Sequence, residues 1–191
     1  MKKLLIILLF IPGFCYSQDS ASKEYSSNGA LNNGKRYILD TIFGGATNKV
    51  EQIYIDGLPG GSFSELTTLY YNGSGKEGLV LGIFDRKTNE YGVKFYDYIY
   101  LNLDREDAIS FFTVVDYIKD TQKSYLGEKN QENHVYFKVR DITFLLYLDG
   151  GYKMKVFWKE YISDWQGTGF ERMKRKFEKR INQANKGKIG N

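Results

Sequence analysis

Apolar residues recur at two different periods along this chain. Between residues 36 and 103, and again between 134 and 159, they fall in short runs separated by Gly, Asn and Asp. This spacing is typical of antiparallel strands joined by turns. The predicted strands cover residues 36–43, 49–56, 65–71, 79–86, 91–103, 134–140, 142–148 and 152–159.

The clearest strand pattern lies at residues 91–103. Successive side chains of a strand point to opposite faces. One face carries Val93, Phe95, Ile99, Leu101 and Leu103, and the other carries Lys94, Tyr96, Tyr98 and Tyr100. Asp97 falls on the apolar face, where an unpaired carboxylate is costly. We therefore expect Asp97 to be paired, at an edge or beside a bulge, with a binding role as the alternative.

Two stretches have the helical period instead. The first follows Asp104, which is suited to cap a helix together with Asp107 three residues later. The second covers residues 169–187 and ends at Gly187, a residue that commonly stops helices. Its apolar residues step by three or four and form one narrow stripe: Phe170, Met173, Phe177, Ile181 and Ala184.

Together these patterns predict one α+β domain over residues 36–191. We expect a curved or two-layered antiparallel β-sheet of about eight strands with two packed helices. A small open barrel is the alternative architecture. Residues 18–35 are rich in Ser, Asn and Gly. They are predicted to be a flexible lead, because they have too little apolar surface to fold alone.

Residues 1–17 are predicted to be a signal peptide. Lys2 and Lys3 precede an apolar core that ends at Phe14, which is shorter than the roughly 20 residues of a membrane span. Small residues at Cys15 and Ser17 favour cleavage between Ser17 and Gln18. Lipidation of Cys15 is the alternative, but the large Phe14 stands directly before the cysteine.

The leader resembles those of exported bacterial proteins. We therefore expect a periplasmic or extracellular protein that is soluble after cleavage, with no transmembrane segment in the mature chain. Cleavage after Ser17 also removes the only cysteine. An exported chain without cysteine has no disulfide, no thiolate nucleophile and no Cys-type metal site.

Few residues suggest catalysis. The single histidine, His134, alternates with Tyr136 and Lys138 and is predicted on the wetter face of its strand; no G-x-S-x-G or H-E-x-x-H motif accompanies it. Residues 73–78 match G-x-G-x-x-G, but a strand pattern follows where a dinucleotide site needs a helix. A hairpin loop is the better interpretation. We expect no catalytic residue, metal or cofactor.

Residues 158–165 combine flat rings with carboxylates. The candidate ligand-binding residues are Trp158, Glu160, Tyr161, Asp164 and Trp165. Aromatic rings stack on sugars, carboxylates accept hydroxyl hydrogens, and paired carboxylates carry out glycoside hydrolysis. The alternative is that the rings are core anchors, since aromatic side chains dominate many cores through their buried area.

The second charged candidate is the C-terminal helix. From His134 to the end the chain has 13 Lys/Arg against 6 Asp/Glu. The candidate basic surface consists of Arg172, Lys174, Arg175, Lys176, Lys179 and Arg180. Such a helix suits an anionic envelope component or an acidic glycan, whereas nucleic acid is a poor partner for an exported protein. The alternative is a docked helix whose charges are solvated or paired within the helix, as in Glu171–Arg175.

These patterns favour a non-catalytic envelope or extracellular binding or accessory protein whose ligand is unknown. A carbohydrate-binding module, or a carboxylate-based glycan hydrolase that uses residues 158–165, is the alternative.

Overall fold

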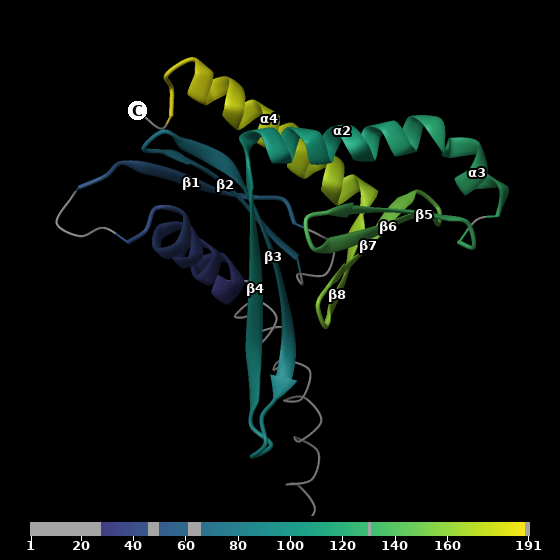
Figure 1. The fold of residues 1–191 in the computed structure, drawn as a ribbon, viewed down its shortest axis with the longest axis horizontal. Helices are drawn as coiled ribbons and strands as arrows, with labels where there is room; N and C mark the ends of the chain where they lie inside the picture. Colours follow the sequence, from purple (N-terminus) through teal and green to yellow (C-terminus); the bar gives the residue numbers. More distant parts are fainter. Residues whose placement is uncertain (1–27, 46–49, 61–65, 130, 190–191) are drawn as a thin grey trace, which may run out of the picture.

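A computed structural model of the chain describes residues 28–45, 50–60, 66–129 and 131–189. It contains two four-stranded antiparallel sheets with helices packed against them (Figure 1). The predicted α+β class, with eight strands in two layers, is confirmed. The predicted signal peptide and residues 18–27 of the predicted lead lie outside the described residues.

The first sheet has the order β1-β2-β3-β4 and the second β5-β6-β7-β8, so each strand pairs with its neighbour in sequence. The first sheet contains β1 (Ile53–Leu58), β2 (Leu66–Gly73), β3 (Lys76–Thr88) and β4 (Lys94–Asp104). The second contains β5 (His134–Val139), β6 (Ile142–Leu148), β7 (Tyr152–Trp158) and β8 (Tyr161–Gln166). The far end of the β3–β4 hairpin extends beyond β1, β2 and the second sheet (Figure 1).

Glycine-rich turns connect these strands as the sequence predicted. The G-x-G-x-x-G stretch is the β2–β3 hairpin turn, in which Gly73 pairs with Lys76. Ser74 and Gly75 both have positive φ, 46° and 74°. Two consecutive positive φ values are typical of the tight turns that match strand twist. Gly150, with φ 62°, turns the chain between β6 and β7 in the same way.

One predicted strand is wrong and one strand was missed. Residues 36–43 are a short apolar run beside a glycine-rich turn, which predicts a strand, but the chain is helical from residue 28 to 37 and continues as the π-helix η2 (Ile38–Ile42). Residues 161–166, predicted only as part of an aromatic cluster, form β8. Their alternating burial is that of a strand with one face in the core. A short continuous apolar run such as 36–43 does not distinguish a strand from a buried helical segment.

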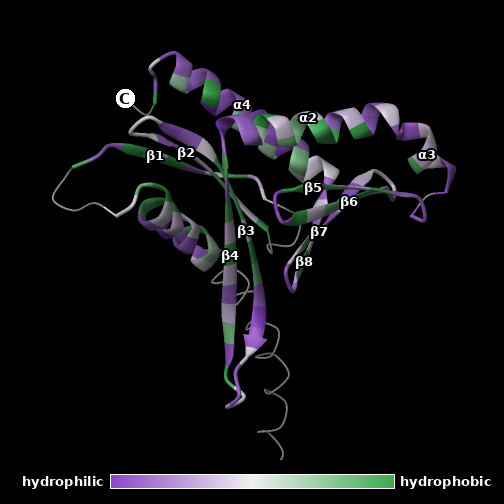
Figure 2. Cartoon of the chain, viewed as in Figure 1, coloured by the Kyte–Doolittle hydropathy of each residue, from purple (hydrophilic) through white to green (hydrophobic). Residues whose placement is uncertain are grey.

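The two predicted helices are present, together with a short one. They are α2 (Arg105–Thr121) and α4 (Gly167–Asn185), and α3 (Lys123–Glu128) follows α2. The side chain of Asp104 accepts a hydrogen bond from the Asp107 backbone N–H, as expected for the cap. Gly187, with φ 63°, lies just past the end of α4. Figure 2 shows polar and apolar residues alternating along both long helices.

One large core joins the two sheets to α2 and α4. It includes Leu79 and Leu103 of the first sheet, Phe144 of the second, and Phe111 and Phe177 of the helices. β8 also contacts β3 and β2. Burial of this continuous apolar surface is the main force that holds the two sheets together.

A second, smaller core lies on the other face of the first sheet. There Ile38 of the N-terminal helix packs with Leu69, Tyr71 and Val80. Figure 1 shows the N-terminal helix on the side of the first sheet away from α4. The N-terminal helix therefore covers part of the face of β4 that carries the tyrosines predicted from the sequence. The ring of Tyr37 stacks on that of Tyr100, with 5.4 Å between the ring centres.

The prediction of a flexible lead is wrong for residues 28–35. This segment is helical, and Ala30 is buried. The prediction depends on composition, in which the glycines of this segment count as a sign of flexibility. A Cβ at Gly34 would lie 2.6 Å from a methyl carbon of Leu69, so this glycine lets the helix approach the sheet closely. The Tyr100 hydroxyl also donates to the Ala30 carbonyl at 2.6 Å.

Candidate functional site

The aromatic rings predicted to bind sugar lie in the core. Trp158, Tyr161 and Trp165 are all buried, and Trp165 has no exposed surface. The Trp165 ring packs against Phe111 and Phe170, with 6.1 and 5.3 Å between ring centres. A ring buried in this way cannot stack on a ligand, so the core-anchor alternative holds for these residues.

The two carboxylates of the cluster are not brought together. Asp164 lies on the outer face of the second sheet, directly opposite Lys155, whose ammonium is 2.9 Å from its carboxylate. Glu160 lies in the turn between β7 and β8 and pairs with Lys87 at 2.8 Å. Since each carboxylate is neutralised by a different lysine, this geometry does not support a hydrolase that uses both.

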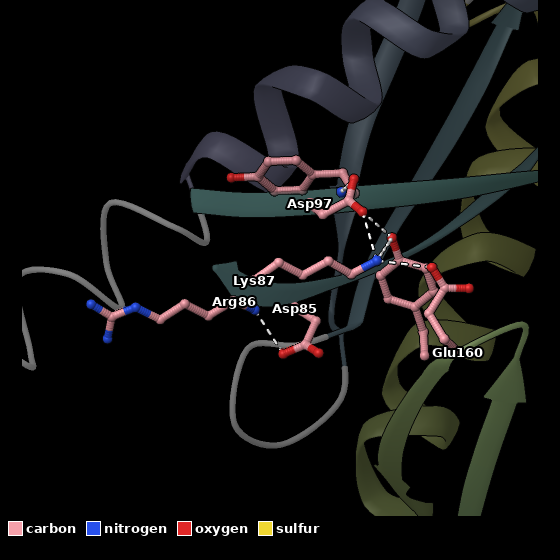
Figure 3. Close-up of polar contacts among 7 residues, drawn as sticks. Asp85, Arg86, Lys87, Asp97 and Glu160 are labelled. Atoms are coloured by element: carbon pink, nitrogen blue, oxygen red, sulfur yellow. Dashed lines mark hydrogen bonds and ion pairs between the residues drawn. The ribbon is translucent and has the colours of Figure 1, made fainter. Parts of the chain in front are cut away.

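Instead, Glu160 and Tyr161 belong to a polar cluster with two residues of the β3–β4 hairpin. Figure 3 shows the Lys87 side chain extending between Asp97 of β4 and Glu160. Lys87 is 2.9 Å from the Asp97 carboxylate, and the Tyr161 hydroxyl donates to the same carboxylate at 2.5 Å. The expectation that Asp97 is paired is confirmed. The cluster ties the long hairpin to the second sheet.

The electrostatics of this cluster favour the charged forms of its two carboxyl groups and its lysine. They favour the neutral form of Tyr161, whose pKa is raised by burial and by its hydrogen bond to Asp97. The hydroxyl of Tyr161, and then the ammonium of Lys87, lower the pKa of Asp97. Lys87 also lowers the pKa of Glu160. In return, hydrogen bonds to Glu160 and Asp97 raise the pKa of Lys87. Such a lysine stays an ammonium and is a poor nucleophile or base.

Acid titration should report this cluster through the variant Lys87→Met. A carboxyl whose pKa is lower in the folded than in the unfolded protein stabilises the fold above its unfolded pKa. It loses that contribution as the pH falls through the folded-state pKa. We therefore expect the wild type to melt at a higher Tm than Lys87→Met near neutral pH. The difference should shrink between about pH 4 and pH 2.

Circular dichroism melts across this pH range would measure the effect. Lys94→Met is the matched control, because Lys94 is an exposed residue of the same hairpin and has no carboxylate partner among the described residues. A Tm difference for Lys87→Met that is the same at pH 2 as at pH 7 would contradict the assignment.

Among the described residues, the shifted pKa values all move farther from pH 7. Burial raises the pKa of Tyr71 to about 12. Four more tyrosines have raised pKa values, namely Tyr37, Tyr70, Tyr100 and Tyr161. The pKa is raised for Lys87, Lys153, Lys155 and Lys174 and lowered for Asp97, Asp149 and Glu160. General acids and bases work best with a pKa near the working pH, whereas these shifts are those of buried tyrosines and of structural ion pairs.

The six basic residues predicted on the C-terminal helix divide into two groups. Lys174 pairs with Asp116 of α2. Lys176 and Arg180 both pair with Asp56 of β1, at 3.0 and 2.7 Å. These three cations fix α4 to its neighbours, so they are not a free basic surface. No local sequence pattern indicates these pairs, because each partner is more than 50 residues away.

The other three point outward. Arg172, Arg175 and Lys179 are exposed and have no carboxylate partner among the described residues. Their spacing of three and four places them on one side of α4, opposite the buried stripe that contains Met173 and Phe177. Lys186, one residue beyond the helix, continues this line. We call these four residues, Arg172, Arg175, Lys179 and Lys186, the outer stripe.

The predicted Glu171–Arg175 pair does not form. The Glu171 carboxylate pairs with Lys119 of α2 instead, and the Arg175 side chain donates only to the Glu171 backbone carbonyl at 3.4 Å. Because Glu171 pairs with Lys119, no carboxylate among the described residues neutralises the charge of Arg175 on the outer stripe.

His134 lies on the exposed face of β5, as predicted. Its ring contacts the Glu132 carbonyl at 2.7 Å and packs beside Tyr147. The part of the chain that the structure describes contains no group of three or more His, Cys, Asp or Glu side chains placed to hold a metal ion. Within the same residues, no helix is both long and apolar enough to cross a membrane.

Comparison of the chain with protein-family models, with curated proteins and with solved structures found no match. The interpretation of the outer stripe therefore depends on its own geometry and charge.

Sequence reasoning missed two further basic residues near this helix. Lys119 at the end of α2 and Lys153 of β7 lie beside the first turns of α4, around one cavity with Arg172 and Arg175. No sequence signal could have found them, because α2 and β7 are brought beside α4 only by the tertiary packing.

Proposed function

We propose that this is an exported, non-catalytic protein that binds an anionic component of the cell envelope through the outer stripe of α4. The observation that carries the proposal is the line of exposed cations without carboxylate partners among the described residues. Half of the basic residues of α4 are used internally, yet Arg172, Arg175 and Lys179 all remain free to attract an anionic surface.

Two further observations support the proposal. An exposed row of cations on a helix suits electrostatic contact with anionic lipids or acidic polymers. The pKa shifts favour charged lysines and carboxylates and neutral tyrosines, which suits a stable binding protein better than proton transfer.

Export is inferred from the predicted signal peptide at residues 1–17. The intact mass and cell fraction of the native protein would test that part separately.

The triple variant Arg172→Gln, Arg175→Gln and Lys179→Gln should bind envelope fractions much more weakly than the wild type. Each cation near an anionic surface contributes about 1 kcal/mol, so the loss should be about 100-fold in affinity. Stability should change little, because these side chains are exposed and hold no ion pair. Co-sedimentation with envelope fractions and with vesicles of phosphatidylcholine, with or without phosphatidylglycerol, would measure the binding.

The matched control is the triple variant Lys94→Gln, Lys138→Gln and Lys159→Gln. It removes the same charge from exposed positions on other elements. It should retain most of the binding, apart from a small effect of net charge. Equal losses in the two triple variants would show that the outer stripe is not the binding surface.

A further inference from the structure

A cavity of about 620 Å³ lies at the N-terminal end of the outer stripe. Its walls come from the end of α2, the turn between β6 and β7, and the first turns of α4. Four basic side chains line it: Lys119, Lys153, Arg172 and Arg175. They come from three elements, so the cavity is a tertiary feature rather than a property of one helix.

The basic lining has an excess of positive charge. Lys119 is paired with Glu171 and Lys153 with Asp149, and these are the acidic residues of the lining. Each of these two pairs is neutral overall. Arg172 and Arg175 have no carboxylate partner among the described residues, so the cavity carries two uncompensated positive charges.

The start of α4 adds to this field. Gly167 and Thr168 line the same cavity. The side chain of Gln166 does not cap the helix, and no acidic residue lies in the first turn. The backbone N–H groups of that turn therefore add a partial positive charge to the charge of the two arginines. In contrast, α2 begins with a capping Asp104 and two acids in its first turn.

We propose that this cavity binds a compact, doubly charged anion of the phosphate-monoester class, carried by the envelope component that the outer stripe contacts. The inference deepens the proposed function and rests on it. Two uncompensated charges match a dianion better than a carboxylate or a phosphodiester, which carry one. Two adjacent guanidinium groups also offer forked donors that fit phosphate oxygens. The volume leaves room for the group that bears the phosphate.

Titration of the full chain with inorganic phosphate and with glucose 6-phosphate, followed by backbone amide NMR, would test this site. We expect saturable shifts at Gly151, Gly167 and Thr168, which line the cavity. Acetate and chloride at equal ionic strength should not reproduce them. Absence of such shifts at millimolar phosphate would overturn the inference.

Two double variants of equal charge separate the cavity from the rest of the stripe. Arg172→Gln/Arg175→Gln should weaken phosphate binding by more than about tenfold, because it removes charge-assisted hydrogen bonds. Lys179→Gln/Lys186→Gln lies farther along the same line and should change phosphate binding by less than about twofold. Equal losses in both variants would indicate general attraction by the helix and overturn the inference.

Vesicle binding distinguishes failure of the cavity from failure of the proposed function. Both double variants should weaken binding to phosphatidylglycerol, a phosphodiester lipid. A preference of the wild type for phosphatidic acid that only Arg172→Gln/Arg175→Gln removes would identify a lipid monoester as the source. Binding of glucose 6-phosphate without that preference would identify an ester on an envelope polymer, rather than on a lipid, as the source. Vesicle binding without any phosphate binding would reject the cavity and leave the proposed function standing.

Discussion

Trp165→Ala should be among the most destabilising single substitutions in this protein, with a loss of about 3–5 kcal/mol in the free energy of unfolding. Trp165 has no exposed surface and lies where α2, α4 and the second sheet meet, in contact with Phe111 and Phe170. Truncation removes this buried apolar surface and leaves a cavity among the surrounding rings, which adds to the loss. Thermal melts should show a Tm lower by about 6–20 °C.

Tyr136→Ala is the matched control, because it removes an aromatic ring from the open face of the same sheet. Tyr136 is 70% exposed, so its loss should change stability by no more than about 0.5 kcal/mol. If Trp165→Ala does not fold, Trp165→Phe provides a milder test and should still lower the Tm. An unchanged Tm in the tryptophan variants, together with loss of sugar binding, would return Trp165 to a ligand-stacking role.

Ile38→Ala should cost about 2–5 kcal/mol of stability, because Ile38 is fully buried in the second core. It packs in the cluster that contains Leu69, Tyr71 and Val80 on the face of the first sheet opposite α2 and α4. Urea unfolding followed by tryptophan fluorescence would measure the loss. The result tests the finding that the N-terminal helix is part of the folded body rather than a flexible lead.

Leu39→Ala is the matched control for this prediction. Leu39 is the next residue along the same π-helix and is 44% exposed. It removes a side chain of the same size but should cost about 0.5 kcal/mol or less. Equal effects of the two variants would contradict the described packing, and no effect of either would indicate that this helix does not contribute to stability.

The strands of the second sheet show how much local pattern determines. Three of its four strands and the Asp-Gly-Gly turn follow from alternation and turn chemistry, which are properties of adjacent residues. The N-terminal helix was not predicted because its glycines lower local helix propensity. Gly34 has a different role, as a close contact with Leu69, and a contact of this kind cannot be found from neighbouring residues.

The candidate site also has some features that the local sequence indicates and others that depend on contacts between distant residues. The sequence indicated that Asp97 needs a partner, because alternation puts a carboxylate on an apolar face. Its partner Tyr161 is 64 residues away, and no pattern identifies it. The sequence also indicated a basic helix, but could not separate Lys176, which binds Asp56, from Lys179, which faces outward.

By itself, the sequence determined the α+β class, most of the strands, the two long helices and the basic character of the last one. Those features depend on periodicity, capping and turn residues within short segments. Only the tertiary structure decided that Trp158 and Trp165 are core residues, and that three cations of α4 are paired. It also decided that four basic residues from α2, β7 and α4 surround one cavity. The physical reason is that burial and ion pairing depend on which distant segments meet, and a one-dimensional pattern does not contain that information.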